Sequence, residues 1–377
     1  MISYPDECRQ LDETLLRYIE RWRATEQPMT DGEFNDLALN MFSYQLHYNT
    51  PYAQYCESLG VTRDKLPATW EEIPPLPSTA FKEATIATFN PHNAAIVFET
   101  SGTTRGEGGR HYMETTALYD ASLLASFRTF MLPDHAPLRY LNLVPNPGEN
   151  PHSSLGYMMA KVSVEFGDGH TAWFISDGVL DIEALVGELE AAVDHDRPVC
   201  IATTSFALVH LLDALGERGR YFALPTGSRI METGGFKGRS RYVDRFELYR
   251  KTAEHFGATL GTIISEYGMT ELSSQYYDDV FVRGPLEQET EPRYKTPPPW
   301  MRARVVGANG KTLPYGTVGA LVHVDLANRS SCIAIQTEDL GVEFEPSLFG
   351  QRIVLMGRDA DASLRGCSLT AEDLVLK

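Results

Sequence analysis

The sequence is most distinctive at residues 99–111, which read ETSGTTRGEGGRH and follow an apolar run at Ala94–Phe98 that is typical of a buried strand. Within ten positions the segment holds four hydroxyl residues and four glycines: Thr100, Ser101, Thr103, Thr104, Gly102, Gly106, Gly108 and Gly109. Glycines let a backbone approach a ligand closely, and successive N–H groups with short hydroxyls can surround an anion. The segment therefore predicts a phosphate-binding turn, although a surface loop has the same composition.

Two familiar nucleotide-binding patterns, G-x-x-x-x-G-K-[ST] and G-x-G-x-x-G, are missing from the sequence. Their absence argues against a P-loop NTPase, a protein kinase and a Rossmann dehydrogenase. The formal net charge of −18 argues against nucleic acid and against an anionic membrane surface, because both are bound through clusters of Lys and Arg.

Composition indicates a globular chain, since 377 residues with 43% hydrophobic content are enough for one large domain or two. No run of 18 apolar residues occurs, and the N-terminus lacks the basic and apolar blocks of a signal peptide. The five cysteines form no C-x-x-C pair, and the ten histidines show no zinc-ligand spacing. We expect a reduced, cytoplasmic protein without a membrane span.

Helical and strand patterns alternate along the chain. Residues 6–24 carry apolar side chains at helical spacing, and a capping box at Thr30–Glu33 begins a second helix. From residue 93 onward, expected strands alternate with expected helices, which indicates a layered α/β domain. The strands are Ala94–Phe98, Tyr140–Val144, Thr171–Ile175, Val199–Ala202, Arg229–Met231 and Thr262–Ile264, and the helices are Thr116–Met131, Asp181–His195, Phe206–Leu215 and Ser240–Phe256. Shorter strands at Arg304–Val306, Gly319–Val324, Cys332–Gln336 and Arg352–Met356 predict a mainly β subdomain.

A second distinctive segment, Ser265–Glu271, reads SEYGMTE. It resembles the Y-G-x-T-E motif of the adenylate-forming superfamily, which includes acyl-CoA synthetases, phenylacetate–CoA ligases and luciferases. That superfamily places T-S-G-T-T before Y-G-x-T-E, as this chain does. Three later segments also resemble its motifs: Gly316–Val322, Gln336–Leu340 with Glu338 in place of a glycine, and the hinge-like Gly357–Gly366.

Within that superfamily the chain looks most similar to the acyl-protein synthetases of bacterial luminescence. The similar segments are Pro74–Lys82, His152–Met158, Glu232–Gly238 and Arg365–Ser368. In that family a cysteine near the C-terminus accepts the acyl group, and Cys367 stands at the matching place. The resemblance implies ATP-dependent activation of a fatty acid as an acyl adenylate, transfer to the thiol of Cys367, and delivery to a partner protein such as a reductase or a carrier.

The resemblance also implies a role for each candidate site residue, with ATP and Mg²⁺ as cofactors. At the phosphates, the β- and γ-groups are expected to contact Thr100, Ser101, Gly102, Thr103 and Thr104, the α-phosphate is expected to contact Thr270, and Mg²⁺ is expected at Glu271. The ribose is expected to contact Asp339, the nucleotide Arg358, and the adenine or acyl group Gly234 and Gly235. The Y-G-x-T-E motif that binds the nucleotide also contains Tyr267 and Gly268. Plainer roles stay open for several of them. Glu271 can be a helix N-terminal carboxylate, Asp339 and Gly234–Gly235 can be turn residues, Arg358 can be a solvated side chain, and Cys367 can be a buried apolar residue.

The chain departs from the superfamily pattern in two places. In the superfamily, a glycine and then a lysine usually follow S-G-T-T. In this chain those positions hold Arg105, Gly106 and Glu107. Only ten residues follow Cys367, so we expect no counterpart of the C-terminal domain that carries the superfamily's catalytic lysine. Lys237 is the candidate to replace that lysine, with a solvated lysine as the alternative.

We therefore expect an α/β fold that is similar to the N-terminal domain of adenylate-forming enzymes. The expected divisions are a helical segment at 1–90, an α/β nucleotide-binding core at 91–300, a smaller β subdomain at 301–356, and a hinge-like segment at 357–377 that carries Cys367. Two other functions fit the same sequence. One is a ligase that delivers an acid to CoA or a carrier protein, and the other is a non-catalytic nucleotide- or acyl-binding subunit of a biosynthetic complex.

Overall fold

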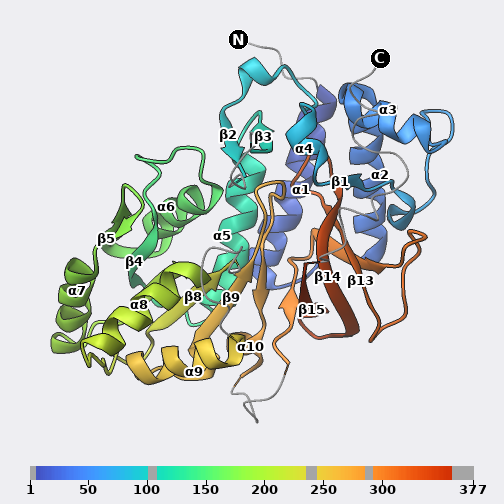
Figure 1. Cartoon of the computed structure of the whole chain (residues 1–377). Coiled ribbons are helices and arrows are strands. Elements are labelled where there is room, and N and C mark those ends of the chain that lie inside the picture. Colours follow the sequence, from blue (N-terminus) through green and yellow to red (C-terminus); the bar gives the residue numbers. More distant parts are fainter. Residues whose placement is uncertain (1–5, 101–107, 235–243, 285–291, 359–377) are drawn as a thin grey trace. The chain divides into compact units, whose positions relative to one another are not determined.

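The computed structural model describes residues 6–100, 108–234, 244–284 and 292–358. The chain forms two compact units, each built from separate stretches of sequence (Figure 1). The first unit comprises residues 1–125, 269–275 and 295–377, and the second comprises residues 126–268 and 276–294. One helix, α5 (Ala117–Met131), contains the first boundary between them.

Three helices open the first unit: α1 (Asp6–Thr25), α2 (Asp31–Tyr48) and α3 (Thr50–Ser58). The helix expected over residues 6–24 is confirmed, and its buried stripe includes Leu15 and Trp22. The expected capping box is also confirmed, because Thr30 and Glu33 each accept a hydrogen bond from the other's backbone N–H.

The first unit also contains an antiparallel sheet in the order β12, β13, β14, β15, β11, of which Figure 1 labels β13, β14 and β15. These strands are β11 (Lys295–Thr296), β12 (Met301–Val306), β13 (Val318–Asp325), β14 (Ala334–Ser347) and β15 (Gly350–Arg358), and β1 (Leu76–Pro77) pairs with β14 in parallel. The predicted β subdomain strands are confirmed, although β14 is longer than expected. Short helical segments complete the unit: α4 (Ala80–Glu83), η1 (Trp70–Glu72) and η2 (Pro91–Asn93).

The strand before the hydroxyl- and glycine-rich segment differs from the expectation. It forms β2 (Ile96–Glu99), which pairs only with β3 (Arg110–Met113) in a separate two-stranded antiparallel sheet. Phe98 is buried, but Ile96 and Val97 are half-buried and Glu99 is exposed. The prediction of a buried strand was therefore wrong, because a two-stranded hairpin covers only part of each strand.

The second unit is a mainly parallel sheet covered by helices. Its strand order is β10, β9, β8, β7, β4, β5, β6, of which β4, β5, β7, β8 and β9 are parallel to their neighbours in that set. The strands are β4 (Leu138–Pro145), β5 (Gly167–Ser176), β6 (Val179–Leu180), β7 (Val199–Thr204), β8 (Arg229–Thr233), β9 (Ile263–Tyr267) and β10 (Tyr276–Asp278). Alternating strands and helices of this kind give the α/β layers that the sequence predicted.

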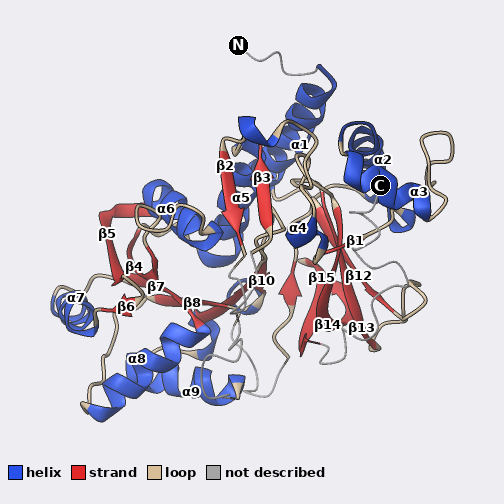
Figure 2. Cartoon of the chain, turned by 45° about the horizontal axis from the view of Figure 1, so that its top comes forward, coloured by secondary structure: helices blue, strands red, loops and turns tan. Residues whose placement is uncertain are grey.

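Helices lie on both faces of this parallel sheet, with α8 and α9 on one side and α6 on the other (Figure 2). The helices are α6 (Ser154–Phe166), α7 (Ile182–Asp194), α8 (Ser205–Glu217), α9 (Arg245–Phe256) and α10 (Val280–Arg283), with η3 (Leu260–Thr262) before β9. Buried aliphatic side chains of α7 and α8, such as Leu189 and Leu208, pack with Ile201 and Ile230 of the sheet. Among the described residues, no helix combines the length and the apolar character needed to cross a bilayer.

Candidate functional site

The hairpin of β2 and β3 closes the base of the hydroxyl- and glycine-rich loop. The backbone N–H of Thr100 donates to the carbonyl oxygen of Gly109 at 2.9 Å, and the N–H of Gly109 donates to Oγ1 of Thr100 at 2.8 Å. A Cβ atom at Gly108 would lie 2.4 Å from the carbonyl oxygen of Thr100, so only glycine fits there. Thr100 and Gly109, which border the segment 100–109, are thus joined by two hydrogen bonds.

Seven of the candidate residues lie outside the described residues: Ser101, Gly102, Thr103, Thr104, Gly235, Lys237 and Cys367. Their roles stay predictions. Thr100, Thr270, Glu271, Asp339 and Arg358 belong to the first unit, whereas Gly234, Tyr267 and Gly268 belong to the second.

The Thr270–Glu271 turn lies in the first unit and is fixed through its backbone. Nδ1 of His111 lies 2.8 Å from the carbonyl oxygen of Thr270, and Nδ2 of Asn328 donates to the carbonyl oxygen of Glu271 at 2.8 Å. Glu271 is only 8% exposed, and no helix begins there, so the helix N-terminal alternative is wrong. The structure therefore joins β3, which follows the hydroxyl- and glycine-rich segment, to the turn at Thr270 and Glu271.

Asp325, at the end of β13, holds the backbone that follows Glu271. Its Oδ2 accepts hydrogen bonds from the N–H groups of Ser273 and Ser274 at 2.9 and 2.8 Å. Its Oδ1 accepts from Oγ of Ser274 at 2.7 Å and from the N–H of Ala327 at 3.0 Å. Burial raises the pKa of Asp325 to about 6, and these four donors act in the opposite direction because they favour the carboxylate.

The chain segment 325–333, which we call the 325–333 loop, is itself held by α2. The buried amide of Gln45 donates to the carbonyl oxygen of Asn328 at 2.9 Å and accepts from the N–H of Ile333 at 2.9 Å. Oγ of Ser273 also donates to Oδ1 of Asn328 at 2.5 Å. The helix α2 thus supports the turn that carries Glu271 through the 325–333 loop.

We expect Asp325→Ala to lower the free energy of unfolding by roughly 2–4 kcal/mol, because it leaves the four buried donors that bond to Asp325 without an acceptor. Burial raises the folded-state pKa from 3.8, so the contribution of this carboxyl to stability falls as the pH rises through about 6. Urea unfolding at pH 8, where Asp325 is ionised, measures the variant. Asp64→Ala, at an exposed aspartate, is the control, and equal stability of the two variants would contradict the expectation.

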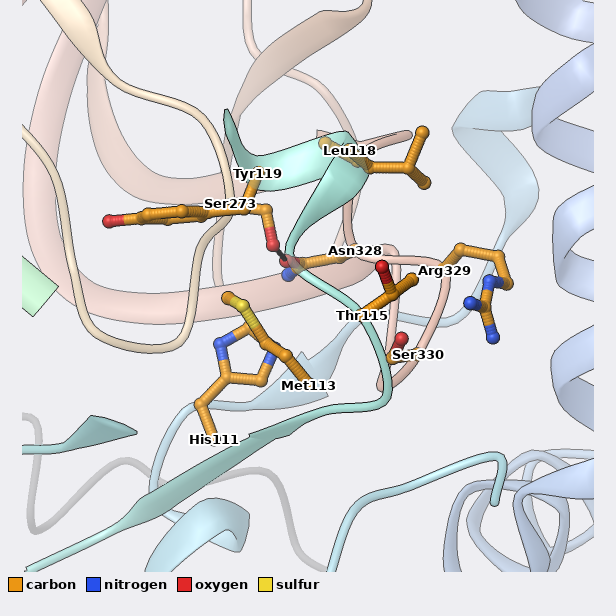
Figure 3. Close-up of a pocket in the computed structure, with 10 residues that line it drawn as sticks. His111, Met113, Thr115, Leu118, Tyr119, Ser273, Asn328, Arg329 and Ser330 are labelled. Atoms are coloured by element: carbon orange, nitrogen blue, oxygen red, sulfur yellow. Dashed lines mark hydrogen bonds between the residues drawn. The ribbon is translucent and has the colours of Figure 1, made fainter. Parts of the chain in front are cut away.

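A small cavity borders this network (Figure 3). Its lining combines polar side chains, among them His111, Ser273 and Asn328, with the apolar Met113 and Leu118. Arg329 also reaches it, and its buried guanidinium donates to the carboxylates of Asp12 at 2.9 Å and Glu114 at 2.7 Å. The cavity is therefore lined by polar and apolar side chains and by an arginine whose charge is balanced by two carboxylates.

Asp339 and Arg358 are cross-strand partners in β14 and β15. The register of β13 against β14 shifts next to this pair, and Thr337 Oγ1 accepts from the N–H of Asp339 at 3.2 Å. Asp339 therefore lies in an irregular part of a strand, where bulges often occur beside functional sites, and not in an ordinary turn. Its contact with ribose stays a prediction, as does the nucleotide contact of Arg358.

In the second unit, Gly234 directly follows β8, and Tyr267 is the last residue of β9, the neighbouring parallel strand. Gly234 has a φ of +83°, so the turn alone accounts for its glycine. Tyr267 is half-buried and its ring lies 5.6 Å from that of Tyr276, while Gly268 is exposed. The carboxyl ends of parallel strands are where α/β sheets bind ligands, and this placement agrees with the prediction without testing it.

Two buried acids, Glu232 and Glu266, lie near the same strand ends, and the sequence pattern assigned neither a role at the site. Glu232 accepts hydrogen bonds from Oγ of Ser205 and from the hydroxyl of Tyr249, the latter at 3.1 Å. Glu266 accepts from Oγ1 of Thr233. Both acids lie in the segments that carry the family resemblance, which was the available signal. Among the described residues, no group of three or more His, Cys, Asp or Glu side chains could hold a metal ion by itself.

Comparison with known proteins agrees with these features. A family model described as "Acyl-protein synthetase, LuxE" matches residues 24–375. The long-chain-fatty-acid–luciferin-component ligase of Vibrio harveyi is 24% identical over 361 residues, which cover 93% of this chain and 89% of that protein.

Solved structures with a similar fold include 2-hydroxyisobutyryl-CoA ligase in two states. The postadenylation state, in complex with R3-HIB-AMP, has a TM-score of 0.64 at 16% identity and is covered over 70% of its length by 90% of this chain. The thioesterification state, in complex with 2-HIB-AMP and CoA, has a TM-score of 0.61 at 16% identity, with 89% of this chain and 70% of that chain covered. At this identity the likeness confirms the predicted fold class alone.

Proposed function

Because the chain belongs to the acyl-protein synthetase family LuxE, we propose that it is a ligase that uses ATP to activate a fatty acid and then transfers the acyl group to a protein thiol. The family match over residues 24–375 carries this proposal, since it includes both signature segments and Cys367. The hydrogen bond between His111 and Thr270 supports it, because it brings β3 and the Y-G-x-T-E turn together within the first unit.

The first step activates the acid. A carboxylate is a poor electrophile, because a nucleophile that attacks it must add charge to a group that is already negative. A carboxylate oxygen of the acid attacks the α-phosphorus of ATP, the bond to the bridging oxygen breaks, and pyrophosphate leaves. Thr100 to Thr104 hold the β- and γ-phosphates and Thr270 contacts the α-phosphate. The protein contributes by positioning the reactants and neutralising charge.

Glu271 fits the expected role at Mg²⁺. Magnesium prefers oxygen ligands and is usually held by one or two carboxylates together with substrate phosphates, so a dedicated cluster of acids is not needed. When bound, it supplies positive charge at the phosphate oxygens. We also assign Asp339 to the ribose, Arg358, Tyr267 and Gly268 to the nucleotide, Gly234 and Gly235 to the adenine or acyl group, and Lys237 to the α-phosphate side of the reaction.

In the second step the thiolate of Cys367 attacks the acyl carbonyl carbon, the carbon–oxygen bond to the phosphate breaks, and AMP leaves. The other four cysteines, Cys8, Cys56, Cys200 and Cys332, are buried and not disulfide-bonded. Burial raises the pKa of Cys200 and of Cys332 to about 12, and it raises the pKa of Cys56 well above its ordinary value. Buried thiols of this kind are poor nucleophiles, which favours Cys367. An acyl-accepting partner protein then receives the acyl group.

Acid-dependent exchange of radioactive pyrophosphate into ATP, measured over a panel of fatty and aromatic acids, tests this function. We expect exchange with at least one fatty acid, together with covalent labelling of the protein by that radioactive acid when ATP and Mg²⁺ are present. Exchange without labelling would favour a ligase that delivers to CoA or a carrier protein. If no acid supports exchange, the chain is not an adenylate-forming enzyme.

A further inference from the structure

His111 contacts the Thr270–Glu271 turn and the 325–333 loop at the same time. It lies in β3, two positions after Gly109, which closes the base of the phosphate-binding loop. Its Nδ1 is 2.8 Å from the carbonyl oxygen of Thr270, and its Nε2 is 3.0 Å from Oγ of Ser331. Figure 3 shows the ring on one side of the cavity, near the Ser273–Asn328 hydrogen bond.

The surroundings of His111 determine its protonation. The side chain is buried, and burial lowers the pKa of His111 to about 4, so the imidazole is neutral at physiological pH. A carbonyl oxygen can only accept a hydrogen bond, so Nδ1 carries the hydrogen and donates it to Thr270. Nε2 is then an acceptor and takes the hydroxyl hydrogen of Ser331, which fixes the tautomer and the plane of the ring.

Ser331 and the imidazole ring are each held by a further contact. The carbonyl oxygen of Ser331 accepts from Nδ2 of Asn49 at 2.9 Å, at the junction of α2 and α3. The ring of Phe81 contacts the imidazole edge-on with centroids 5.9 Å apart. His111 is therefore a rigid neutral donor that connects the hairpin to the turn.

We propose that His111 is a positioning residue for adenylation, whose imidazole N–H holds the Thr270–Glu271 turn in register with the β2–β3 hairpin. It acts through the turn and not by touching a reacting atom. The inference rests on the proposed function, because the turn matters for catalysis only if Glu271 binds Mg²⁺. Placement is important because electrostatic stabilisation depends on charges that are already positioned before the reaction, and a shift of about 1 Å can cost about a hundredfold in rate.

Two amide variants separate this role from bulk packing. An Asn amide places its nitrogen near the position of Nδ1 and can still donate to Thr270, whereas a Gln amide reaches toward Nε2 and leaves that carbonyl without a donor. We expect His111→Gln to lower kcat of acid-dependent pyrophosphate exchange by about tenfold to a hundredfold, with the KM of the fatty acid unchanged. His111→Asn should recover kcat to within about threefold of the wild type.

His255→Gln is the matched control. His255 is a buried histidine of the second unit whose Nδ1 also lies 2.9 Å from a carbonyl oxygen, that of Arg220. We expect this variant to keep the wild-type kcat. A similar loss in both Gln variants would show that the effect is a general consequence of replacing a buried histidine, and it would overturn the proposal.

The remaining outcomes separate the two proposals. Absence of wild-type exchange with every acid overturns the proposed function, whereas wild-type exchange with an unchanged kcat in His111→Gln overturns only the role of His111. Equal losses in His111→Asn and His111→Gln also overturn it. If His111→Gln does not fold, Ser331→Ala is measured in its place. This variant removes the hydroxyl that is hydrogen-bonded to Nε2 of His111, so the ring is no longer held on that side. Its kcat should fall about threefold to tenfold, and an unchanged kcat contradicts the inference.

Discussion

Glu271→Gln is expected to lower acid-dependent pyrophosphate exchange by about a hundredfold to a thousandfold, the range for loss of one positioned electrostatic contact at a reacting group. The substitution keeps the size of the side chain but removes the charge that attracts a divalent cation. The fold of the turn should persist, because Asn328 and His111 hold it through the backbone carbonyls of Glu271 and Thr270. The loss would therefore report the carboxylate and not the turn.

The measurement is the exchange rate as a function of Mg²⁺ concentration, with the acid that the wild-type protein uses best. The variant should need more Mg²⁺ for half-maximal exchange, because one ligand of the ion has lost its charge. Glu345→Gln changes an exposed glutamate of β14 and should leave the exchange rate and the Mg²⁺ requirement unchanged. An unaltered Mg²⁺ requirement in Glu271→Gln would remove Glu271 from the metal site.

Local patterns predicted most of the secondary structure. The periodic apolar stripe of α1 and the capping box of α2 depend on residues three or four positions apart, which the sequence displays directly. The helix α6 was not predicted, although Ser153 caps it by accepting from the N–H of Gly156 at 3.0 Å. A glycine in its first turn weakens the helical signal. The partial exposure of β2 was also hidden, because burial depends on what a strand packs against.

The candidate site was predictable where it depends on short motifs. Thr100 and Glu271 became candidates because they lie in contiguous segments that resemble known motifs. The contacts that join these segments were not, because His111 and Thr270 are 159 positions apart and nothing in the spacing shows their hydrogen bond. Asp325 and Asn328 belong to no motif, and only the fold places them beside the residues that follow Glu271.

The polar character of the 325–333 loop was the one available signal for that network. A run of apolar residues is interrupted there by Asp325, Asn328 and Arg329. Polar and charged side chains are costly to bury unless they are hydrogen-bonded or paired. A sequence alone cannot tell whether they face solvent or each other. In the structure each of the three is buried and hydrogen-bonded, so the loop acts as a rigid support.

Cys367→Ser is expected to abolish the covalent acyl label that forms from radioactive fatty acid and ATP, while pyrophosphate exchange stays within about twofold of the wild type. The two readouts separate because adenylation precedes attack by the thiol and does not need it. Cys367→Ala should behave in the same way, and it excludes an ester on the introduced serine.

Cys200→Ala is the control, since the thiol of Cys200 is fully buried and burial raises its pKa to about 12. This variant should keep the label. Neutral hydroxylamine should release the wild-type label, because it cleaves a thioester readily, and peptide mapping should place the label on Cys367. A label that persists in both Cys367 variants would assign the acyl group to another residue, and a parallel loss of exchange would mean that Cys367 acts in adenylation itself.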